Sequence, residues 1–162
     1  MKKIIAFLFL LYFSFVSGQT EKVLKNSIEK LSEEYLTEMY IKKNFDFASK
    51  MWENGMLTEM KSFYSKNGYE DLTDSILKRQ IKSDVEKYYK KLAKFKVNKI
   101  LDTEIQKENG NIFGQVFFQY SETLKNKTEL IKTMLVFISY DNGKTWFIQD
   151  WKIKPAIAQN RC

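Results

Sequence analysis

The first half of the chain places its apolar residues at the spacing of an α-helix. They recur three or four residues apart, so they line one side of each helix. We predict four helices, over Glu21 to about Lys43, Phe45 to Trp52, about Met56 to Ser65, and from Asp71 or Thr73 to about Leu92. Asn54-Gly55 and Asn67-Gly68 are expected to end the second and third helices, because both residue types tolerate the left-handed conformation at a helix C-terminus. The fourth helix is expected to bury Ile76, Leu77, Ile81, Val85, Tyr88, Tyr89 and Leu92.

After Ala93 the apolar period changes from helical to alternating, which predicts strands with one dry and one wet side. We expect four strands, over Phe95 to Gln106, Ile112 to Ser121, Glu129 to Tyr140 and Thr145 to Ile153. Asn109-Gly110 favours a two-residue type I′ hairpin turn. That turn would set three pairs of residues opposite each other: Leu101 and Phe118, Thr103 and Val116, and Ile105 and Gly114.

Helices that precede a four-stranded antiparallel meander indicate an α+β domain, in which the helices cover one face of a curved sheet. No internal repeat or linker interrupts residues 19–162, so we expect a single domain. The third and fourth strands carry apolar residues on both faces, for example Met134 beside Leu135. The second face would then meet a partner chain, a closing helix or a pocket.

The composition excludes several kinds of chemistry. The chain has no histidine, so it cannot form a Ser-His-Asp triad, a His-paired cysteine nucleophile or an imidazole metal site. Its one cysteine, Cys162, excludes an internal disulfide and a cysteine cluster. We therefore expect no cofactor and no metal.

The N-terminus has the three parts of a secretory signal. Met1-Lys2-Lys3 is positive, residues 4–16 are almost wholly apolar, and Val16-Ser17-Gly18 offers small residues for cleavage. The apolar run is shorter than the roughly 20 residues of a membrane span. We expect residues 1–18 to be removed, which leaves an exported chain, periplasmic or extracellular, without a stable membrane anchor.

The exported chain would carry 25 basic and 20 acidic residues, a net charge of +5. Much of the excess lies between Lys82 and Lys99. These lysines could face an acidic ligand or an anionic surface, although a solvated helix side is the simpler interpretation. Nucleic-acid binding is not expected, because no recognisable module or exposed aromatic sheet is evident.

The order of elements, ending in Trp146-Phe147-Ile148-Gln149-Asp150-Trp151, is similar to the cone-shaped fold of the nuclear transport factor 2-like superfamily, which includes ketosteroid isomerase and SnoaL-like proteins. A short helix opened by Phe45-Asp46-Phe47 adds to the resemblance. The resemblance implies a conical cavity lined by the concave side of the sheet, and frequent dimerisation through the sheet. It implies either a small-molecule enzyme or a non-catalytic binding domain. The histidine found in many such cavities is missing, and no catalytic residue can be transferred.

A second, shorter resemblance is to the Asp-box of sialidases and other β-propellers, in Ser139-Tyr140-Asp141-Asn142-Gly143-Lys144-Thr145-Trp146. One copy cannot make a propeller, which needs at least four blades. We interpret it as a structural turn, in which Asp141 accepts hydrogen bonds from its own loop and Gly143 supplies a positive φ.

Asp150 is the candidate catalytic residue, because it is an acid in an otherwise apolar strand. A two-residue turn at Asn142-Gly143 sets it opposite Leu135, and a three-residue turn sets it opposite Met134. A buried carboxyl there could act as a general base. Alternatively it pairs with Lys132 or Lys152, or accepts a hydrogen bond from a tyrosine. Six tyrosines could supply hydroxyl groups to a cavity, although aromatic residues at these spacings more often belong to the core: Tyr35, Tyr40, Tyr88, Tyr89, Tyr120 and Tyr140.

Two functions follow from these observations. The first is an exported, non-catalytic binding domain that holds a small apolar ligand in its cone or pairs with a protein, including a second copy through the sheet. The alternative is a cofactor-free isomerase or lyase with Asp150 as base and a tyrosine hydroxyl as its partner. The candidate cavity residues are Trp151, Trp146, Tyr120 and Met134.

The signal segment generates the first prediction. Export is expected to remove residues 1–18, because the charged head, apolar run and small residues occur in the order that signal peptidase requires. Intact-mass spectrometry of the protein recovered outside the cytoplasm should give a chain that begins at Gln19. A mass that includes Met1 would contradict the prediction.

Overall fold

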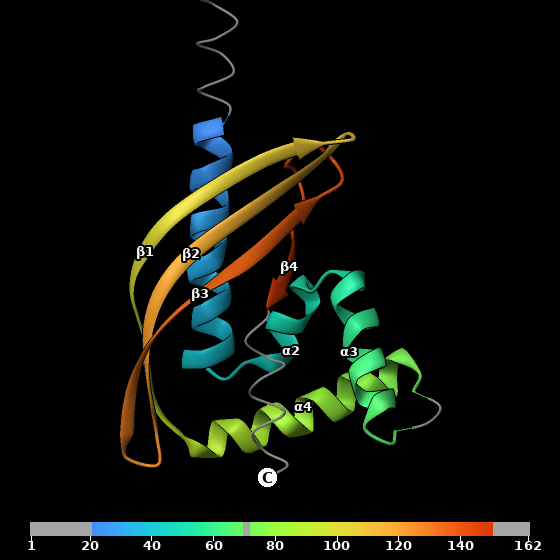
Figure 1. Cartoon of the computed structure of the whole chain (residues 1–162), viewed down its shortest axis with the longest axis vertical. Helices are drawn as coiled ribbons and strands as arrows, with labels where there is room; N and C mark the ends of the chain where they lie inside the picture. The colour runs from blue at the N-terminus through green and yellow to red at the C-terminus, as the bar shows by residue number, and fades with distance from the viewer. Residues whose placement is uncertain (1–20, 70–71, 151–162) are drawn as a thin grey trace, which may run out of the picture.

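The computed structural model describes residues 21–69 and 72–150, and it shows an α+β architecture (Figure 1). Residues 1–20, 70–71 and 151–162 lie outside the described part, which includes the signal segment, Trp151 and Cys162. The helical half contains a long helix over residues 21–36, the π-helical turn η1 (Thr37–Ile41), α2 (Phe45–Ala48), the 3-10 turn η2 (Ser49–Met51), α3 (Asn54–Lys66) and α4 (Asp74–Lys91). The four predicted helical regions are therefore confirmed.

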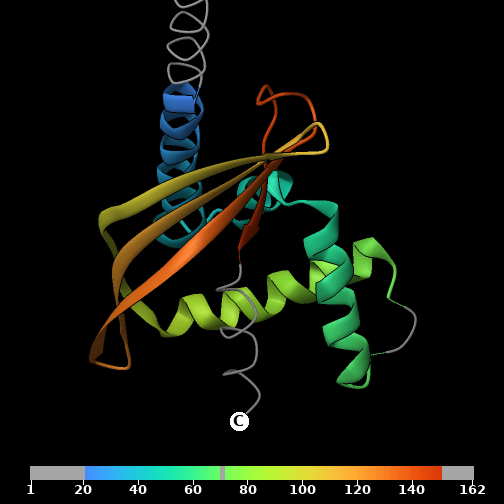
Figure 2. The same ribbon diagram turned by 45° about the horizontal axis from the view of Figure 1, so that its top comes forward.

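The second half forms one antiparallel sheet in the order β1-β2-β3-β4. Its strands are β1 (Leu92–Glu108), β2 (Asn111–Leu124), β3 (Lys127–Ser139) and β4 (Phe147–Asp150). The three long strands curve around the helices, and α4 leads directly into β1 (Figures 1 and 2). The predicted fold class, helices packed on a curved four-stranded meander, is confirmed.

Asn54-Gly55 does not end the second helix as predicted, because it opens α3. Glu53 is the N-cap, and its side chain accepts a hydrogen bond from the Met56 backbone N–H at 3.0 Å. Asn67-Gly68 does end α3, and Gly68 has a φ of +86°. In α4 the predicted inward residues are buried except Ile76, which is 38% exposed and marks the edge of the apolar stripe.

The β1–β2 hairpin has the predicted turn, since Asn109 and Gly110 both have positive φ. Two of the three predicted pairs are confirmed, Thr103 with Val116 and Ile105 with Gly114. The pair of Leu101 with Phe118 is wrong, because a register shift between Ile100 and Asp102 puts Ile100 opposite Phe118. Leu101 occupies this bulge and is 40% exposed.

The inner face of the sheet packs on the helices. Gly114 lets the first helix approach closely, since a Cβ there would lie 2.6 Å from the Ile28 Cδ1 atom. Thr103 adds a hydrogen bond from its hydroxyl to the Glu29 carboxylate at 2.6 Å. The largest fully buried side chains on this side are Tyr35, Tyr64, Phe118, Phe137, Ile28, Met39, Met60, Leu77, Ile81, Leu135 and Ile148.

Successive side chains along each strand point alternately to the inner and the outer face of the sheet. Along β2 and β3, several of the outer side chains are only half-buried. Phe113, Phe117, Met134, Val136 and Phe147 lie on this side, as the register of the strands shows. The sequence-based expectation that β3 and β4 carry apolar residues on both faces is therefore matched in the geometry. No described helix covers the outer face (Figures 1 and 2).

The loop between β3 and β4 has the structure predicted from its resemblance to an Asp-box. The Asp141 Oδ1 atom accepts hydrogen bonds from the backbone N–H groups of Lys144 and Thr145, at 3.1 and 2.8 Å, and from the Ser139 hydroxyl at 2.8 Å. These bonds lower the pKa of Asp141 to about 2, and the bond from the Thr145 N–H has the largest effect. Gly143 has a φ of +84°, and a side chain there would clash with Leu24.

Asp141→Asn is expected to lower the thermal midpoint at neutral pH. Because the folded protein lowers the pKa of Asp141, this carboxylate adds stability above its unfolded pKa of about 3.9 and loses that contribution as the pH falls toward 2. The gap between the parent and the variant should therefore narrow between about pH 4 and pH 2. Thermal unfolding followed by circular dichroism across that range measures it, and a gap independent of pH would contradict the assignment.

Candidate functional site

Asp150 lies at the end of β4 on the inner face, opposite Leu135. This is the partner expected from a two-residue turn, although the loop is longer. The pairing of β3 with β4 begins at Ile138 and Phe147, with eight residues between them. This even number gives the same register as a two-residue turn would give. The carboxyl group is 4% exposed and therefore sits among the packed helices.

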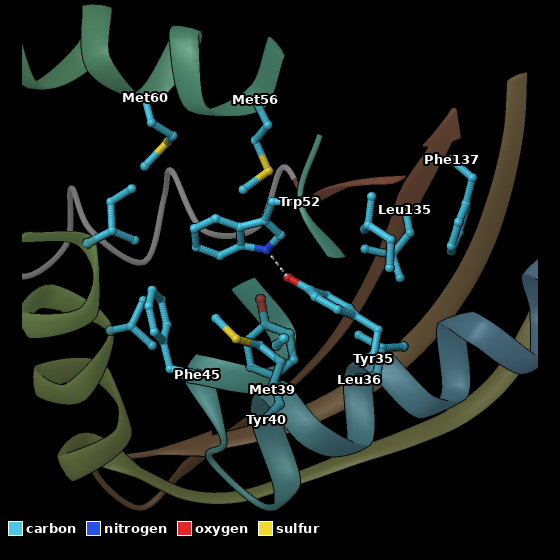
Figure 3. Packing of buried hydrophobic residues seen from close by; sticks show 14 of the residues in the cluster. Tyr35, Leu36, Met39, Tyr40, Phe45, Trp52, Met56, Met60, Leu135 and Phe137 are labelled. Carbon is cyan, nitrogen blue, oxygen red and sulfur yellow. Dashed lines mark hydrogen bonds between the residues drawn. The ribbon is translucent and has the colours of Figure 1, made fainter. Parts of the chain in front are cut away.

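Two tyrosine hydroxyls donate to the same oxygen of this carboxylate. The distance to Asp150 Oδ2 is 3.0 Å from Tyr35 and 2.5 Å from Tyr40. The Trp52 indole N–H in turn donates to the Tyr35 hydroxyl at 3.0 Å, and Figure 3 shows this bond amid the methionine and aromatic side chains of the core. Among the described residues, the geometry contains the predicted hydrogen bonding of Asp150 to tyrosine, and Lys152, the other expected partner near it in sequence, lies outside them. We call Asp150, Tyr35, Tyr40 and Trp52 the Asp150 cluster.

The π-helical turn η1 explains how two tyrosines five residues apart reach one oxygen. In a regular α-helix, residues i and i+5 do not lie on the same face. Here the Lys42 N–H donates to the Thr37 carbonyl at 2.8 Å, an i to i+5 bond that widens the turn and rotates Tyr40 toward Tyr35. The widened turn thus creates the pair of donors.

Trp52 is placed by a short connection to the sheet. It forms an isolated parallel bridge with Ile148, and the Glu53 N–H donates to the Ile148 carbonyl at 3.1 Å. The segment therefore continues the sheet beyond β4 and holds the indole inside. Trp52, which was expected at the end of the second helix, lies in this extended connection, where it is 4% exposed and packs edge-on against Phe45.

The electrostatics of the cluster keep both hydroxyls protonated. Burial, and next the negative charge of Asp150, raise the pKa of Tyr35 and Tyr40 well above the ordinary value of about 10. At neutral pH each tyrosine is therefore a neutral donor to the carboxylate. Such an arrangement can stabilise a buried negative charge, and in an open site it could also polarise a substrate carbonyl.

The same pairing of tyrosine with carboxylate recurs elsewhere in the core. Tyr88 donates to Glu122 at 2.6 Å, and Tyr64 donates to Asp84 at 2.8 Å. Asp84 also accepts from Lys87 at 2.9 Å, and although burial opposes ionisation, these bonds lower its pKa. The Asp150 cluster is thus one of several places where tyrosine hydroxyls satisfy a buried acid.

The candidate cavity residues do not form one lining. Tyr120 is buried on the inner face and stacks on Phe95, with ring centroids 4.9 Å apart. Trp146 is also buried, but it packs edge-on against Phe137 near the Asp-box loop, and its indole N–H has no hydrogen-bond partner among the described residues. Met134 points to the outer face, and Trp151 lies outside the described residues.

Two surface hollows lie near the other end of the sheet, and neither borders Asp150. One, of about 300 Å³, lies around the Asn109-Gly110 turn, Leu24 and Asn142. The other, of about 340 Å³, lies between Glu21, Lys25 and the paired ends of β1 and β2. Within residues 21–69 and 72–150, no three acidic, cysteine or histidine side chains are grouped to hold a metal ion.

Glu53 is a buried acid that sequence reasoning missed. Besides capping α3, it accepts hydrogen bonds from the Gln149 side chain at 3.1 Å and the Tyr140 hydroxyl at 3.2 Å. Burial opposes ionisation, yet these bonds together with those from the backbone N–H groups of α3 lower its pKa. Its role depends on β4 lying beside the start of α3, which no local sequence pattern encodes.

Comparison of the chain with protein-family models, with curated proteins and with solved structures gives no match. No helix in the described part of the chain combines the length and apolar character that crossing a bilayer requires. The functional interpretation therefore depends on the geometry of the chain itself.

Tyr40→Phe is expected to destabilise the fold by about 1.5–3 kcal/mol, because it removes a hydrogen bond to a buried charged group. Chemical denaturation measures the loss. Tyr140→Phe is the matched control, since that ring is 54% exposed and its hydroxyl bond to Glu53 is longer. Equal losses in the two variants would show that the Asp150 cluster is not a special source of stability.

Proposed function

We propose that this protein is an exported, non-catalytic binding domain with a nuclear transport factor 2-like fold. The enclosure of Asp150 is the observation that supports a non-catalytic role. The one acid suited to act as a base is 4% exposed, and its Oδ2 atom already accepts from Tyr35 and Tyr40. A catalytic base must instead reach the proton that it removes from a substrate.

The binding surface in this proposal is the apolar outer face, defined as Phe113, Phe117, Met134, Val136 and Phe147. Each of these side chains is half-buried on the outer side of its strand. An apolar surface of this kind on a soluble domain is typical of a protein-interaction site. A protein partner fits better than a small ligand in the cone, because Tyr35, Leu135 and other side chains fill the space between the sheet and the helices.

The resemblance to the cone-shaped superfamily suggests a second copy of this chain as one such partner. A two-fold axis between two facing sheets would set the apolar outer face of one copy against the same face of the other.

The alternative function is a cofactor-free isomerase or lyase that uses Asp150 as base and a tyrosine hydroxyl as hydrogen-bond donor. The close approach of Tyr35 and Tyr40 to Asp150 favours it, because such donors can stabilise an enolate. It would require the packed helices to open toward β4. Asp150→Asn separates the two functions: loss of a co-purifying ligand with unchanged stability supports the enzyme, and loss of stability alone supports the binding domain.

Native mass spectrometry of the protein purified from its own host tests the proposal directly. A dimer, or a stoichiometric complex with another protein, is the expected result. A monomer that retains a small apolar molecule would instead place the ligand in the cone and contradict the use of the outer face.

Met134→Glu is expected to weaken the complex at least ten-fold, because it puts a charge into the centre of the apolar outer face. The fold should survive, since the side chain is only half-buried. Ser62→Glu on the exposed side of α3 is the matched control. Sedimentation or mass photometry over a concentration series measures the dissociation constant, and equal values for the parent and Met134→Glu would contradict the proposed surface.

A further inference from the structure

A group of lysines lies on the outer side of the sheet, at the end where β1 begins. These lysines are separate from the residues that define the apolar outer face. The strand register sets Lys99 and Lys132 at the two ends of one row, with Gln119 between them. The next row contains Lys96, Ser121 and Leu130, and the last contains Lys94, Thr123 and Thr128. We call Lys94, Lys96, Lys99 and Lys132, together with Leu130, the lysine patch.

All four lysines of the patch are exposed, and none makes an ion pair within the described chain. Other described lysines do pair with carboxylates, among them Lys25, Lys42, Lys82, Lys87 and Lys127. The nearest acid on the same face is Asp102, one row beyond Lys99. Glu122 and Glu129 belong to the inner parity of their strands, where Glu122 bonds to Tyr88 and Glu129 pairs with Lys127. The patch therefore presents uncompensated positive charge.

Leu130 lies within this charge and is 64% exposed. Leu130 lies in the same row as Lys96. The rows on either side of it contain Lys94 and Lys99. The β2–β3 hairpin and the junction of α4 with β1 meet at this same end of the molecule, so the patch projects from a corner (Figure 1). An exposed leucine surrounded by unpaired lysines combines two features that separately are ordinary on a protein surface.

We propose that the lysine patch binds reversibly to the surface of a bilayer rich in anionic lipids. The ammonium groups lie against the phosphate headgroups, and Leu130 enters the boundary between headgroups and acyl chains. Gln119, Ser121 and Thr123 each lie beside a lysine in one of the three rows and can hydrogen-bond to phosphate or glycerol oxygens. Such contact is peripheral and salt-sensitive, so it differs from an anchor that spans the membrane.

A membrane fits this surface better than a soluble polyanion does. A polyanion would use the lysines but leave Leu130 in water, whereas a bilayer accommodates both. Nucleic acid is disfavoured further, because the patch contains no aromatic side chain on which a base could stack and no arginine to read one. The outward leucine is thus the feature that selects between the two kinds of partner.

Vesicle co-sedimentation of the exported protein tests the proposal. We expect binding to vesicles that contain phosphatidylglycerol, little binding to phosphatidylcholine alone, and release in high salt. Lys96→Gln/Lys99→Gln should weaken binding about 25-fold, since each lysine near an anionic surface contributes a factor of about five. Lys61→Gln/Lys66→Gln on α3 is the matched control, because both of its lysines are also exposed.

Leu130→Ser tests the apolar contact without a change of charge. It should weaken vesicle binding roughly ten-fold, whereas Val23→Ser, at a comparably exposed site on the first helix, should have no effect. Circular dichroism and thermal midpoints establish that each variant is folded. Vesicle binding that none of the patch variants weakens would overturn the proposal, as would no binding to anionic vesicles at all.

Polyphosphate provides the comparison with a soluble polyanion. If the protein binds polyphosphate but not vesicles, and Leu130→Ser leaves that binding unchanged, the patch is a polyanion site and the membrane proposal is wrong. The result is independent of the proposed partner on the apolar outer face, because Met134→Glu leaves every residue of the lysine patch intact. Loss of the protein complex without loss of vesicle binding would separate the two surfaces.

Discussion

The need to satisfy buried carboxylates without histidine, and with few buried cations, determines much of this structure. A buried carboxylate is costly unless donors surround it, and each of Asp84, Glu122 and Asp150 accepts from a tyrosine hydroxyl. The Asp150 cluster has the widest reach, because its members come from the first helix, the π-helical turn, the segment before α3 and the last strand. One oxygen therefore ties together parts of the chain that are more than 100 residues apart in sequence. The orientation of the helices on the sheet depends on this link and on the aromatic packing around it.

This constraint also separates the two faces of the sheet by role. On the inner face, the polar groups that could perform chemistry bond to one another, and the apolar groups fill the space between the layers. Among the described residues of the outer face, a bond of this kind is found at β4, where the Gln149 side chain donates to Glu53. The apolar side chains of the outer face, such as Phe117 and Met134, are only half-buried, and its patch lysines make no ion pair within the described chain. Both groups can therefore contact a partner molecule. The proposed binding function at the outer face and the structural role of Asp150 would have the same physical origin, because the donors that stabilise the carboxylate also separate it from a substrate.

Much of the fold could be predicted from local patterns, whereas the features that form the site could not. Helical and alternating periods predicted the elements, and Asn109-Gly110 predicted a turn that sets Thr103 opposite Val116. The bulge at Leu101 escaped prediction because it depends on the curvature of the whole sheet. The π-helical turn escaped because nothing in its sequence differs from an ordinary helix, yet it brings Tyr40 beside Tyr35. Asn54-Gly55 was misassigned because Glu53 caps α3 and joins β4 at the same time, and that contact spans almost 100 residues.

The edge strand β1 is built to resist pairing with a strand of another chain. A partner would therefore contact the outer face of the sheet and not its β1 edge. The strand is 17 residues long, and a flat strand of that length at a sheet edge would invite pairing with other chains. Three register shifts bend it, and its outward positions carry mainly charged groups, positive from Lys94 to Lys99 and negative from Asp102 to Glu108. Bulges and charges of this kind oppose the uniform hydrogen-bond ladder that edge pairing requires. The same charges do not hinder a contact made by the outer face, because there they lie at the border of the apolar side chains. The sequence of β1 therefore opposes open-ended strand addition, which is consistent with the proposed contact on the curved outer face of the sheet.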